Sequence, residues 1–340
     1  MKVLVTGGAG YIGSHTVLSL LTAGHEVTVV DNLANSSPEA LRRVETLAGR
    51  SLASVEADIR DGRALSAVME QSRPDAVVHF AGLKAVGEST EKPLEYYANN
   101  VFGTVALLKA MEAVGCRRIV FSSSATVYGE AQYLPFDEAH PLGATNPYGR
   151  TKHFVEEIIA DWTASVDGAG AALLRYFNPV GAHASGRIGE DPSGIPNNLA
   201  PYITRVAVGS LASLSVFGGD YDTRDGTGER DYVHVEDLAE AHLAALEHLG
   251  GATGCHPFNI GTGRTTTVLE MVRAFEAASG RTIPHEIMPR RAGDVACSYA
   301  AVDKAAAVLN WRATRDLADM CASAWRWQSQ NPAGYADASG

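Results

Sequence analysis

Short apolar runs alternate with segments of helical pattern over the first half of this 340-residue chain. Glycines, prolines and polar residues separate the two kinds of segment. The apolar runs cover 3–5, 27–30, 52–55, 76–80, 118–121 and 171–174. The helical patterns cover 12–21, 38–47, 65–69, 93–114 and 147–164. Uninterrupted apolar strands that alternate with helices are typical of a parallel sheet covered on both faces, so we predict a doubly wound α/β fold.

The pattern changes after about residue 176. Segment 181–232 is rich in Gly, Pro, Asn and Asp, and irregular segments of that length inside a compact protein are usually functional. Helical patterns return at 235–249, 268–279, 305–309 and 317–328. We therefore expect a first domain at 1–179, to which some later segments return, a smaller α/β domain at 180–330 that binds the substrate, and a disordered tail at 331–340.

A glycine-rich loop lies between the first apolar run and the first helix. Gly8, Gly10 and Gly13 have the spacing G-x-G-x-x-G, which permits a tight turn and lets a pyrophosphate approach the backbone. The helix that follows points free N–H groups at that phosphate. Asp31 ends the second apolar run, where an acid accepts hydrogen bonds from the adenosine ribose and repels the 2′-phosphate of NADP. This combination predicts a Rossmann-type domain that binds NAD.

Other residues follow the ends of the predicted parallel strands, where ligands bind in such sheets. Asp58 and Ile59 follow the third strand, and Phe80 follows the fourth. Taken alone, each of these is more often an ordinary turn residue than a ligand contact. From position in the pattern, the residues expected to contact the cofactor are Gly7, Gly10, Tyr11, Ile12, Gly13, Asp31, Asn32, Asn35, Ser36, Asp58, Ile59, Phe80, Ala81, Gly82 and Ser122.

A serine cluster at 122–124 follows the fifth strand, and Tyr148 precedes Lys152 by four residues near the start of a helix. That spacing places both side chains on one helical face. A neighbouring ammonium group, helped by the positive nicotinamide, lowers the pKa of a tyrosine, which is otherwise near ~10, so Tyr148 can accept a proton from a substrate hydroxyl. Ser124 can hold the same oxygen by a hydrogen bond. An isolated Tyr-x-x-x-Lys is usually an exposed pair, but with the NAD loop it indicates hydride transfer.

Composition narrows the possible partners. A net charge of −11 opposes binding to nucleic acid or to an anionic membrane surface. No stretch is apolar enough to span a bilayer, and the first residues do not have the pattern of a signal peptide. No two of the four cysteines have the spacing of metal ligands, so we expect no metal site and a cytoplasmic protein with reduced thiols. These cysteines are Cys116, Cys255, Cys297 and Cys321.

Several longer blocks are specific enough to indicate a family. They include TGGAGYIGSH at 6–15, HFAGLKAVGES at 79–89, PLEYYANN at 93–100, FSSSATVYG at 121–129 and LLRYFNPVGA at 173–182. They continue with GEDPSGIPNNLAPYI at 189–203, DGTGERDYVHVEDLA at 225–239 and PRRAGD at 289–294. On these blocks the chain, from its first residue to about 330, resembles the UDP-glucose (UDP-galactose) 4-epimerases of the extended short-chain dehydrogenase/reductase family. Arg150 departs slightly from the pattern, because lysine is also common there.

The resemblance implies a reaction and roles for residues. The reaction is the NAD-dependent interconversion of UDP-galactose and UDP-glucose in galactose metabolism, through a 4-keto sugar, by a homodimer that associates through the helices at 93–114 and 147–164. Ser124, Tyr148 and Lys152 match the catalytic positions. Lys84, Asn99, Tyr176 and Phe177 match further NAD contacts. The positions on the UDP-sugar side are Lys84, Ser124, Tyr148, Asn178, Asn198, Leu199, Ser215, Phe217, Arg230, Tyr232, Arg291, Asp294 and Ser298.

The chemistry of that second set suits a nucleotide sugar. Arg230 and Arg291 can make charge-assisted contacts to a diphosphate, Asp294 can accept from ribose hydroxyls, and Phe217 can lie against the uracil. In the family, a small residue near the place of Ser298 admits a 2′-N-acetyl group, so we expect UDP-N-acetylglucosamine and UDP-N-acetylgalactosamine as further substrates.

Two other functions are weighed against this one. The first is another NAD-dependent UDP-sugar enzyme, such as a 4,6-dehydratase or a decarboxylase. A 4,6-dehydratase needs an acid–base pair to remove water, characteristically Asp-Glu after the catalytic Ser or Thr, whereas Ala125 and Thr126 follow Ser124 here. The second is a non-catalytic Rossmann protein that senses NAD, which would have no need of the Tyr148 and Lys152 pair.

Overall fold

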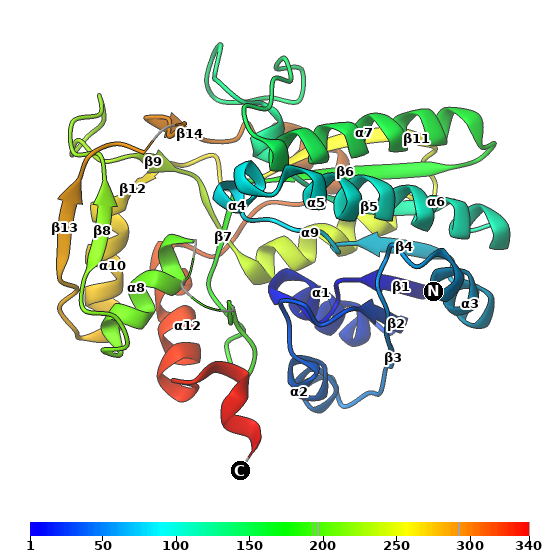
Figure 1. Cartoon of the computed structure of the whole chain (residues 1–340), viewed down its shortest axis with the longest axis horizontal. Helices are drawn as coiled ribbons and strands as arrows, with labels where there is room; N and C mark the ends of the chain where they lie inside the picture. The colour runs from blue at the N-terminus through cyan, green and yellow to red at the C-terminus, as the bar shows by residue number, and fades with distance from the viewer. Residues whose placement is uncertain (193, 195, 197, 292, 340) are drawn as a thin grey trace.

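A computed structural model describes the chain except for residues 193, 195, 197, 292 and 340. Its main feature is a seven-stranded sheet in the order β11-β6-β5-β4-β1-β2-β3, in which every pair of neighbours is parallel (Figure 1). The strands are β1 (Lys2–Thr6), β2 (Glu26–Asp31), β3 (Ala53–Glu56), β4 (Ala76–His79), β5 (Arg118–Ser124), β6 (Gly170–Tyr176) and β11 (Gly254–Ile260). The chain order reverses between β1 and β4. Such a reversal opens a ligand crevice at the carboxyl ends of the strands.

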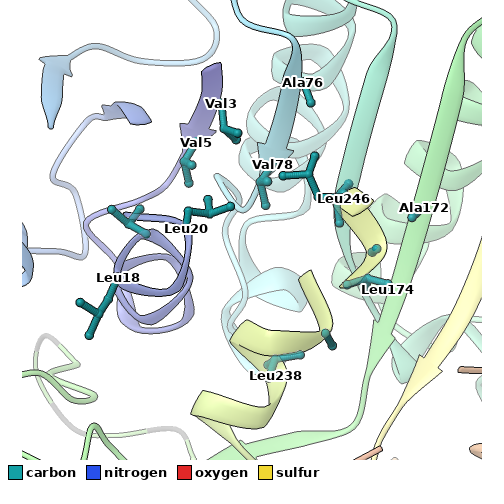
Figure 2. Packing of buried hydrophobic residues seen from close by; sticks show 14 of the residues in the cluster. Val3, Val5, Leu18, Leu20, Ala76, Val78, Ala172, Leu174, Leu238 and Leu246 are labelled. Atoms are coloured by element: carbon teal, nitrogen blue, oxygen red, sulfur yellow. The ribbon is translucent and has the colours of Figure 1, made fainter. Parts of the chain in front are cut away.

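Helices cover both faces of this sheet, as the alternating pattern predicts. On one face lie α1 (Tyr11–Thr22), α2 (Pro38–Ala48), α9 (Val235–His248) and α11 (Asp303–Leu309). Figure 2 shows Val3, Val5 and Val78 of the strands close to Leu20 of α1 and Leu246 of α9. On the other face lie α3 (Gly62–Ser72), α6 (Gly103–Val114) and α7 (Pro147–Ser165). The doubly wound α/β prediction is confirmed.

The helix predicted over 93–114 is not a continuous α-helix. It consists of α5 (Pro93–Tyr96), a π-helical segment (Tyr97–Phe102) and α6, and the short helix α4 (Val86–Glu91) precedes it. The π-helical segment buries Asn100, whose side chain hydrogen-bonds the backbone of Leu83 through both its oxygen and its nitrogen. The same amide donates to Thr151 Oγ1 of α7. The widened turn therefore fixes the loop after β4, and π-helical turns often occur at functional sites.

The remaining elements form a smaller region beside one end of the large sheet (Figure 1). It contains a second core built from α8 (Leu199–Ala207), α10 (Val268–Ser279) and α12 (Leu317–Gln330). Three small sheets accompany it, in the orders β10-β7, β12-β9-β14 and β13-β8. Their strands are β7 (Asn178–Val180), β8 (Leu214–Phe217), β9 (Glu229–Arg230), β10 (Tyr232–His234), β12 (Thr266–Thr267), β13 (His285–Met288) and β14 (Cys297–Ser298).

β11 and α9 return to the large sheet although they follow residue 180 in sequence. The boundary at 179/180 stays a prediction. Among the described residues there are also two 3₁₀ segments, Ala125–Val127 and Gly334–Ser339. No helix among the described residues is long and apolar enough to cross a membrane.

The expectation of a disordered tail at 331–340 is wrong for the first six of its residues. Asn331 and Tyr335 are buried. The ring of Tyr335 packs on Trp327 of α12, with 4.8 Å between the ring centroids, and its backbone N–H donates to Asp191. A polar composition predicted disorder, but one aromatic side chain with a matching surface is enough to hold the segment in place.

Candidate functional site

A cavity of about 800 Å³ lies at the carboxyl ends of β1, β4 and β5, at the point where the strand order reverses. Its walls come from the glycine loop, the loops after β2 and β4, the serine cluster, α7, and the smaller region. One cavity thus joins the segments predicted to bind a dinucleotide to those predicted to bind a UDP-sugar.

The glycine loop can accept a pyrophosphate against its backbone. Gly7 has φ of +70°, and a Cβ there would lie 2.7 Å from the backbone nitrogen of Ala81. A Cβ on Gly13 would strike the carbonyl oxygen of Gly7. Gly10 caps α1 without a side chain, so the first-turn N–H groups of the helix remain for a phosphate. The loop therefore fits the dinucleotide predicted for it.

Asp31 organises the loops on either side of it. One carboxylate oxygen accepts from the backbone N–H of Ala9 at 2.9 Å, and the other accepts from Leu33 N at 2.9 Å and Ser36 Oγ at 2.8 Å. The carboxylate is thereby fixed at the rim of the cavity, which it lines. A fixed negative charge there favours ribose hydroxyls and repels a 2′-phosphate.

Tyr148, Lys152 and Ser124 come together on one wall of the cavity. Lys152 Nζ donates to the carbonyl oxygen of Ser122 at 2.6 Å and lies 5.9 Å from the centre of the Tyr148 ring. Ser124 lies close enough to Tyr148 to lower its pKa by hydrogen bonding, and Ser124 Oγ accepts from Thr126 Oγ1 at 2.9 Å. The three side chains thus come from β5 and α7 in the arrangement that proton transfer requires.

The protonation of this cluster is governed by burial. Burial lowers the pKa of Lys152 to about 8, and the carboxylate of Glu156 partly opposes that shift. Burial raises the pKa of Tyr148 above its usual value, while the hydrogen bond with Ser124 lowers it. Among the protein groups, desolvation of the phenolate outweighs the hydrogen bonding with Ser124. The lowering of the Tyr148 pKa by Lys152 together with the positive nicotinamide stays a prediction.

Lys84 lies in the loop after β4 and also lines the cavity. Its Nζ pairs with Glu190 at 3.3 Å, and Asn198 donates to the same carboxylate oxygen at 2.9 Å. Asn99, in the π-helical segment, also lines the cavity and donates to Asn100. Glu190 therefore joins residues predicted on the NAD side to residues predicted on the UDP-sugar side.

The arginines predicted to hold a diphosphate surround one aspartate. Arg230 Nη2 lies 3.9 Å from Asp294, and Arg291 Nε donates to Asp294 at 3.0 Å. The Arg291 guanidinium also covers the ring of Phe217, with 4.6 Å to the ring centroid. Ser298 is paired with Arg230 in the strand register and lines the cavity. Two cations, one anion and an aromatic ring thus lie close together, and of these Arg230 and Asp294 line the cavity.

Most of the predicted site residues line the cavity. They are Gly7, Gly10, Tyr11, Ile12, Gly13, Asp31, Asn32, Asn35, Ser36, Ile59, Phe80, Ala81, Gly82, Lys84, Asn99, Ser122, Ser124, Tyr148, Lys152, Tyr176, Phe177, Asn178, Asn198, Arg230, Asp294 and Ser298. Those that do not line it are Asp58, Leu199, Ser215, Phe217, Tyr232 and Arg291.

Three of the residues outside the cavity wall, Asp58, Tyr232 and Arg291, are engaged in contacts or buried elsewhere. Asp58 is engaged by the guanidinium of Arg60 at 2.7 and 2.8 Å, and this hydrogen bonding holds its pKa well below the usual range. Tyr232 is buried in β10, where burial raises its pKa to about 12. Arg291 is paired with Asp294 above Phe217. Leu199 begins α8 and Ser215 lies within β8. Their roles in ligand binding stay predictions.

Comparison with known proteins agrees with this geometry. Residues 3–261 match the sequence model of the NAD dependent epimerase/dehydratase family. The chain belongs to that family. It is 56% identical to the UDP-glucose 4-epimerase of Bacillus subtilis, over 99% of this chain and 100% of that protein. It is 57% identical to the human UDP-glucose 4-epimerase, over 98% of each chain.

A solved structure extends the comparison to ligands. The UDP-glucose 4-epimerase of Bifidobacterium longum, in complex with NAD⁺ and UDP, is 50% identical and superposes with a TM-score of 0.95, over 98% of this chain and 100% of that one. As in other members of the NAD dependent epimerase/dehydratase family, the cofactor of this chain is NAD, and its glycine loop and Asp31 fit that cofactor.

Some cavity residues were not predicted from the sequence. Glu190 and Asp191 lie within the block at 189–203, so the resemblance could have indicated them. Tyr335 also lines the cavity, but it lies beyond about residue 330, where the resemblance ends. No motif or periodicity marks it, because its position depends on tertiary contacts alone.

Proposed function

We propose that this chain interconverts UDP-galactose and UDP-glucose by inverting the 4′-hydroxyl of the sugar. The observation that carries this proposal is the single cavity that brings Tyr148, Lys152 and Ser124 together with the glycine loop and Arg230. The identity of 56% to a UDP-glucose 4-epimerase over nearly the whole chain supports it.

Tyr148 is the proton acceptor in this proposal. Its phenolic oxygen takes the proton of the 4′-hydroxyl, and Ser124 orients that hydroxyl by a hydrogen bond. Lys152 is held by the carbonyl oxygen of Ser122, so its ammonium favours ionisation of the adjacent phenol. NAD, held by the glycine loop and Asp31, would supply the nicotinamide that takes up and gives back the C4′ hydride. Tyr148 gives its proton back to the oxygen of the 4-keto sugar when the hydride returns.

Inversion requires the sugar to present its other face while the nucleotide stays in place. Arg230 and Asp294, which line the cavity, anchor the diphosphate and ribose, and Arg291 supports them through its hydrogen bond to Asp294. Firm contacts at the nucleotide and few contacts at the sugar allow rotation about the bond to the diphosphate. The arginine cluster thus explains how one active site can serve both sugars.

Ser298 supports a wider range of sugars. This small side chain lines the cavity, whereas its bulky neighbour Tyr299 is not part of the cavity wall. The space beside Ser298 suits a 2′-N-acetyl group, so UDP-N-acetylglucosamine and UDP-N-acetylgalactosamine are substrates in this proposal.

The rival 4,6-dehydratase chemistry finds little support here. The two residues after Ser124 are Ala125 and Thr126, and Thr126 Oγ1 donates to Ser124 rather than offering a carboxylate to the substrate. An enzyme that removes water from the sugar needs an acid and a base at this place.

A homodimer is also part of the proposal. Leu94, Phe102 and Phe154 are large apolar side chains that stay exposed by 80%, 57% and 42% on α5, the π-helical segment and α7. Tyr97 stacks on Phe154 and continues this apolar surface. A surface of this kind is typical of a subunit interface. We further place the protein in the cytoplasm, in keeping with its four free cysteines.

A direct assay tests the function. The purified chain is incubated with UDP-galactose, and products are identified by NMR, with parallel samples of UDP-glucose and the two N-acetylated sugars. Formation of UDP-glucose with no net change in NAD is the expected result. A 4-keto-6-deoxy sugar, loss of carbon dioxide or no reaction would contradict the proposal and favour one of the rivals.

A further inference from the structure

The carboxyl-terminal segment 331–336 lies against a wall of the active-site cavity. The Tyr335 hydroxyl donates to the carbonyl oxygen of Gly189 at 3.3 Å and accepts from the N–H of Gly189 at 3.2 Å. The N–H of Tyr335 donates to Asp191 at 2.9 Å. Gly334 has φ of +68°, and a Cβ there would strike the carboxylate of Asp191. The segment is therefore closely fitted to residues 189–191.

Residues 189–191 all line the cavity, and α12 fixes them from behind. Trp327 Nε1 donates to the carbonyl oxygen of Glu190 at 3.1 Å, and a Cβ on Gly189 would strike the Trp327 ring. On the cavity side, the Glu190 carboxylate pairs with Lys84. The position of Lys84 therefore depends, through Glu190, on Trp327 and Tyr335.

Arg43 connects this assembly to the NAD-binding part of the chain. It lies on α2, which begins just after the loop that Asp31 organises. Its guanidinium covers the rings of Tyr335 and Trp327, at 5.2 and 5.9 Å to their centroids, and donates to Asn331 Oδ1 at 2.7 Å. It also donates to the carbonyl oxygen of Arg187 at 3.0 Å. The Arg43 side chain thus joins α2, the loop at 187–191 and the carboxyl-terminal segment.

Tyr335 itself reaches the cavity, beside the glycine loop. Burial raises the pKa of Tyr11 in that loop, and Glu190 and Tyr335 are close enough to raise it further. Tyr11 OH donates to the carbonyl oxygen of Gly181, which ties the glycine loop to the smaller region. Tyr335 and Glu190 therefore lie over the same end of the cavity as the loop that fits the pyrophosphate.

We propose that residues 331–336, held by Arg43 and Trp327, form a clasp that keeps residues 189–191 over the glycine loop and slows the release of NAD. The proposal rests on the NAD site of the proposed function. Any outward movement of residues 189–191 breaks the contacts of Tyr335, and the guanidinium of Arg43 over the Tyr335 ring opposes the same movement. Tyr335 and Arg43 are thus positioning residues for cofactor retention.

The test measures NAD exchange in the full-length protein. Each variant is loaded with isotope-labelled NAD, chased with unlabelled NAD, and the label that remains is counted over time. Tyr335→Ala and Arg43→Met should each exchange NAD about tenfold faster, a factor that corresponds to about 1.4 kcal/mol. The double variant should be little faster than either single one, because both break the same clasp. Tyr335→Phe, which keeps the ring and loses the hydroxyl contacts, should fall between wild type and Tyr335→Ala.

Arg42→Met is the matched control. Arg42 and Arg43 pair with the same carboxylate of Glu39, but the side chain of Arg42 is 67% exposed, whereas that of Arg43 is 13% exposed. Its exchange rate should equal that of the wild type. Circular dichroism and thermal melting in excess NAD show whether each variant is folded. If Tyr335→Ala is unfolded, the NAD exchange rates of Arg43→Met and Tyr335→Phe test the clasp instead.

The possible outcomes distinguish a failure of the clasp proposal from a failure of the proposed function. Unchanged exchange in folded Tyr335→Ala or Arg43→Met, with NAD bound by the wild type, overturns the clasp and leaves the proposed function standing. A wild-type chain that binds no NAD overturns the proposed function itself. Equal acceleration by Arg42→Met would also overturn the clasp, since it would show a general effect of charge on α2.

Discussion

Lys152 Nζ donates a 2.6 Å hydrogen bond to the carbonyl oxygen of Ser122. The ammonium is thereby fixed at the carboxyl end of β5, where it also lies 4.8 Å from the centre of the Phe121 ring. Lys152 is only 5% exposed, so burial disfavours its charged form and lowers its pKa. This one contact therefore connects the end of a core strand to the protonation of the catalytic cluster.

The pH dependence of kcat should reflect the ionisation of Lys152. Burial lowers the pKa of Lys152 to about 8, so the group is charged below that pH and neutral above it. Because the charged form assists Tyr148, kcat should fall as pH rises through about 8. In Lys152→Arg the guanidinium stays charged at all these pH values, so the alkaline fall should move upward even if maximal turnover is reduced. A profile of kcat for both proteins between pH 6 and about 10 checks this; an unchanged alkaline limb in Lys152→Arg would contradict it.

Tyr148→Phe should remove the proton acceptor and keep the ring. We expect kcat for UDP-galactose to fall by about 10²–10⁴, the usual contribution of general acid–base catalysis. Binding of UDP-glucose, measured by calorimetry, should stay within a few fold, because the arginine cluster is untouched. Normal turnover in this variant would remove Tyr148 from the mechanism.

The sequence predicted those parts of the fold that depend on local patterns. Each of the six apolar runs contains residues of a strand of the large sheet, because buried parallel strands are uninterrupted apolar segments. The apolar pattern did not predict β11, which contains Pro257 and the polar residues His256 and Asn259. β11 is an edge strand paired only with β6, and an edge tolerates proline and polar residues that a central strand does not.

The same distinction holds for the site. The glycine loop, Asp31 and the Tyr148 and Lys152 pair were predicted because each occupies a defined place relative to a strand or helix. The contacts of Tyr335 with residues 189–191 and the pairing of Lys84 with Glu190 were not, since they join segments more than 100 residues apart. Nothing in local periodicity reports contacts of that kind.

Arg230 should contribute to substrate binding more than to chemistry. Its side chain lines the cavity beside Asp294, so Arg230→Met should raise KM for UDP-galactose by about 10- to 100-fold, as expected for lost charge-assisted hydrogen bonds. Arg290→Met is the control, because Arg290 is bound to Asp220 and covers Tyr221 away from the cavity wall. Steady-state kinetics and UDP titration distinguish the two. Similar KM increases in both variants would indicate only a loss of surface charge.

Ser298 should decide which sugars enter. Ser298→Tyr fills the space beside Arg230, so turnover of UDP-N-acetylgalactosamine should fall by about tenfold or more relative to UDP-galactose. Ser298→Ala keeps the space and should preserve the wild-type ratio. The ratio of kcat/KM for the two substrates is the measurement. If Ser298→Tyr leaves that ratio unchanged, another residue limits the pocket.

Behind the catalytic wall, Glu156 and Arg175 form a buried ion pair that should dominate local stability. Arg175 Nη2 lies 2.6 Å from Glu156, Ser123 donates to the same carboxylate, and both charged side chains are at most 5% exposed. Glu156→Gln leaves the guanidinium without its counter-charge, so the free energy of unfolding should fall by about 3–5 kcal/mol.

The adjacent Glu157 is 63% exposed, and Glu157→Gln should change that free energy by no more than about 0.5 kcal/mol. Urea denaturation of both variants in excess NAD measures the difference. Equal losses would mean that the pair contributes no more than a surface contact.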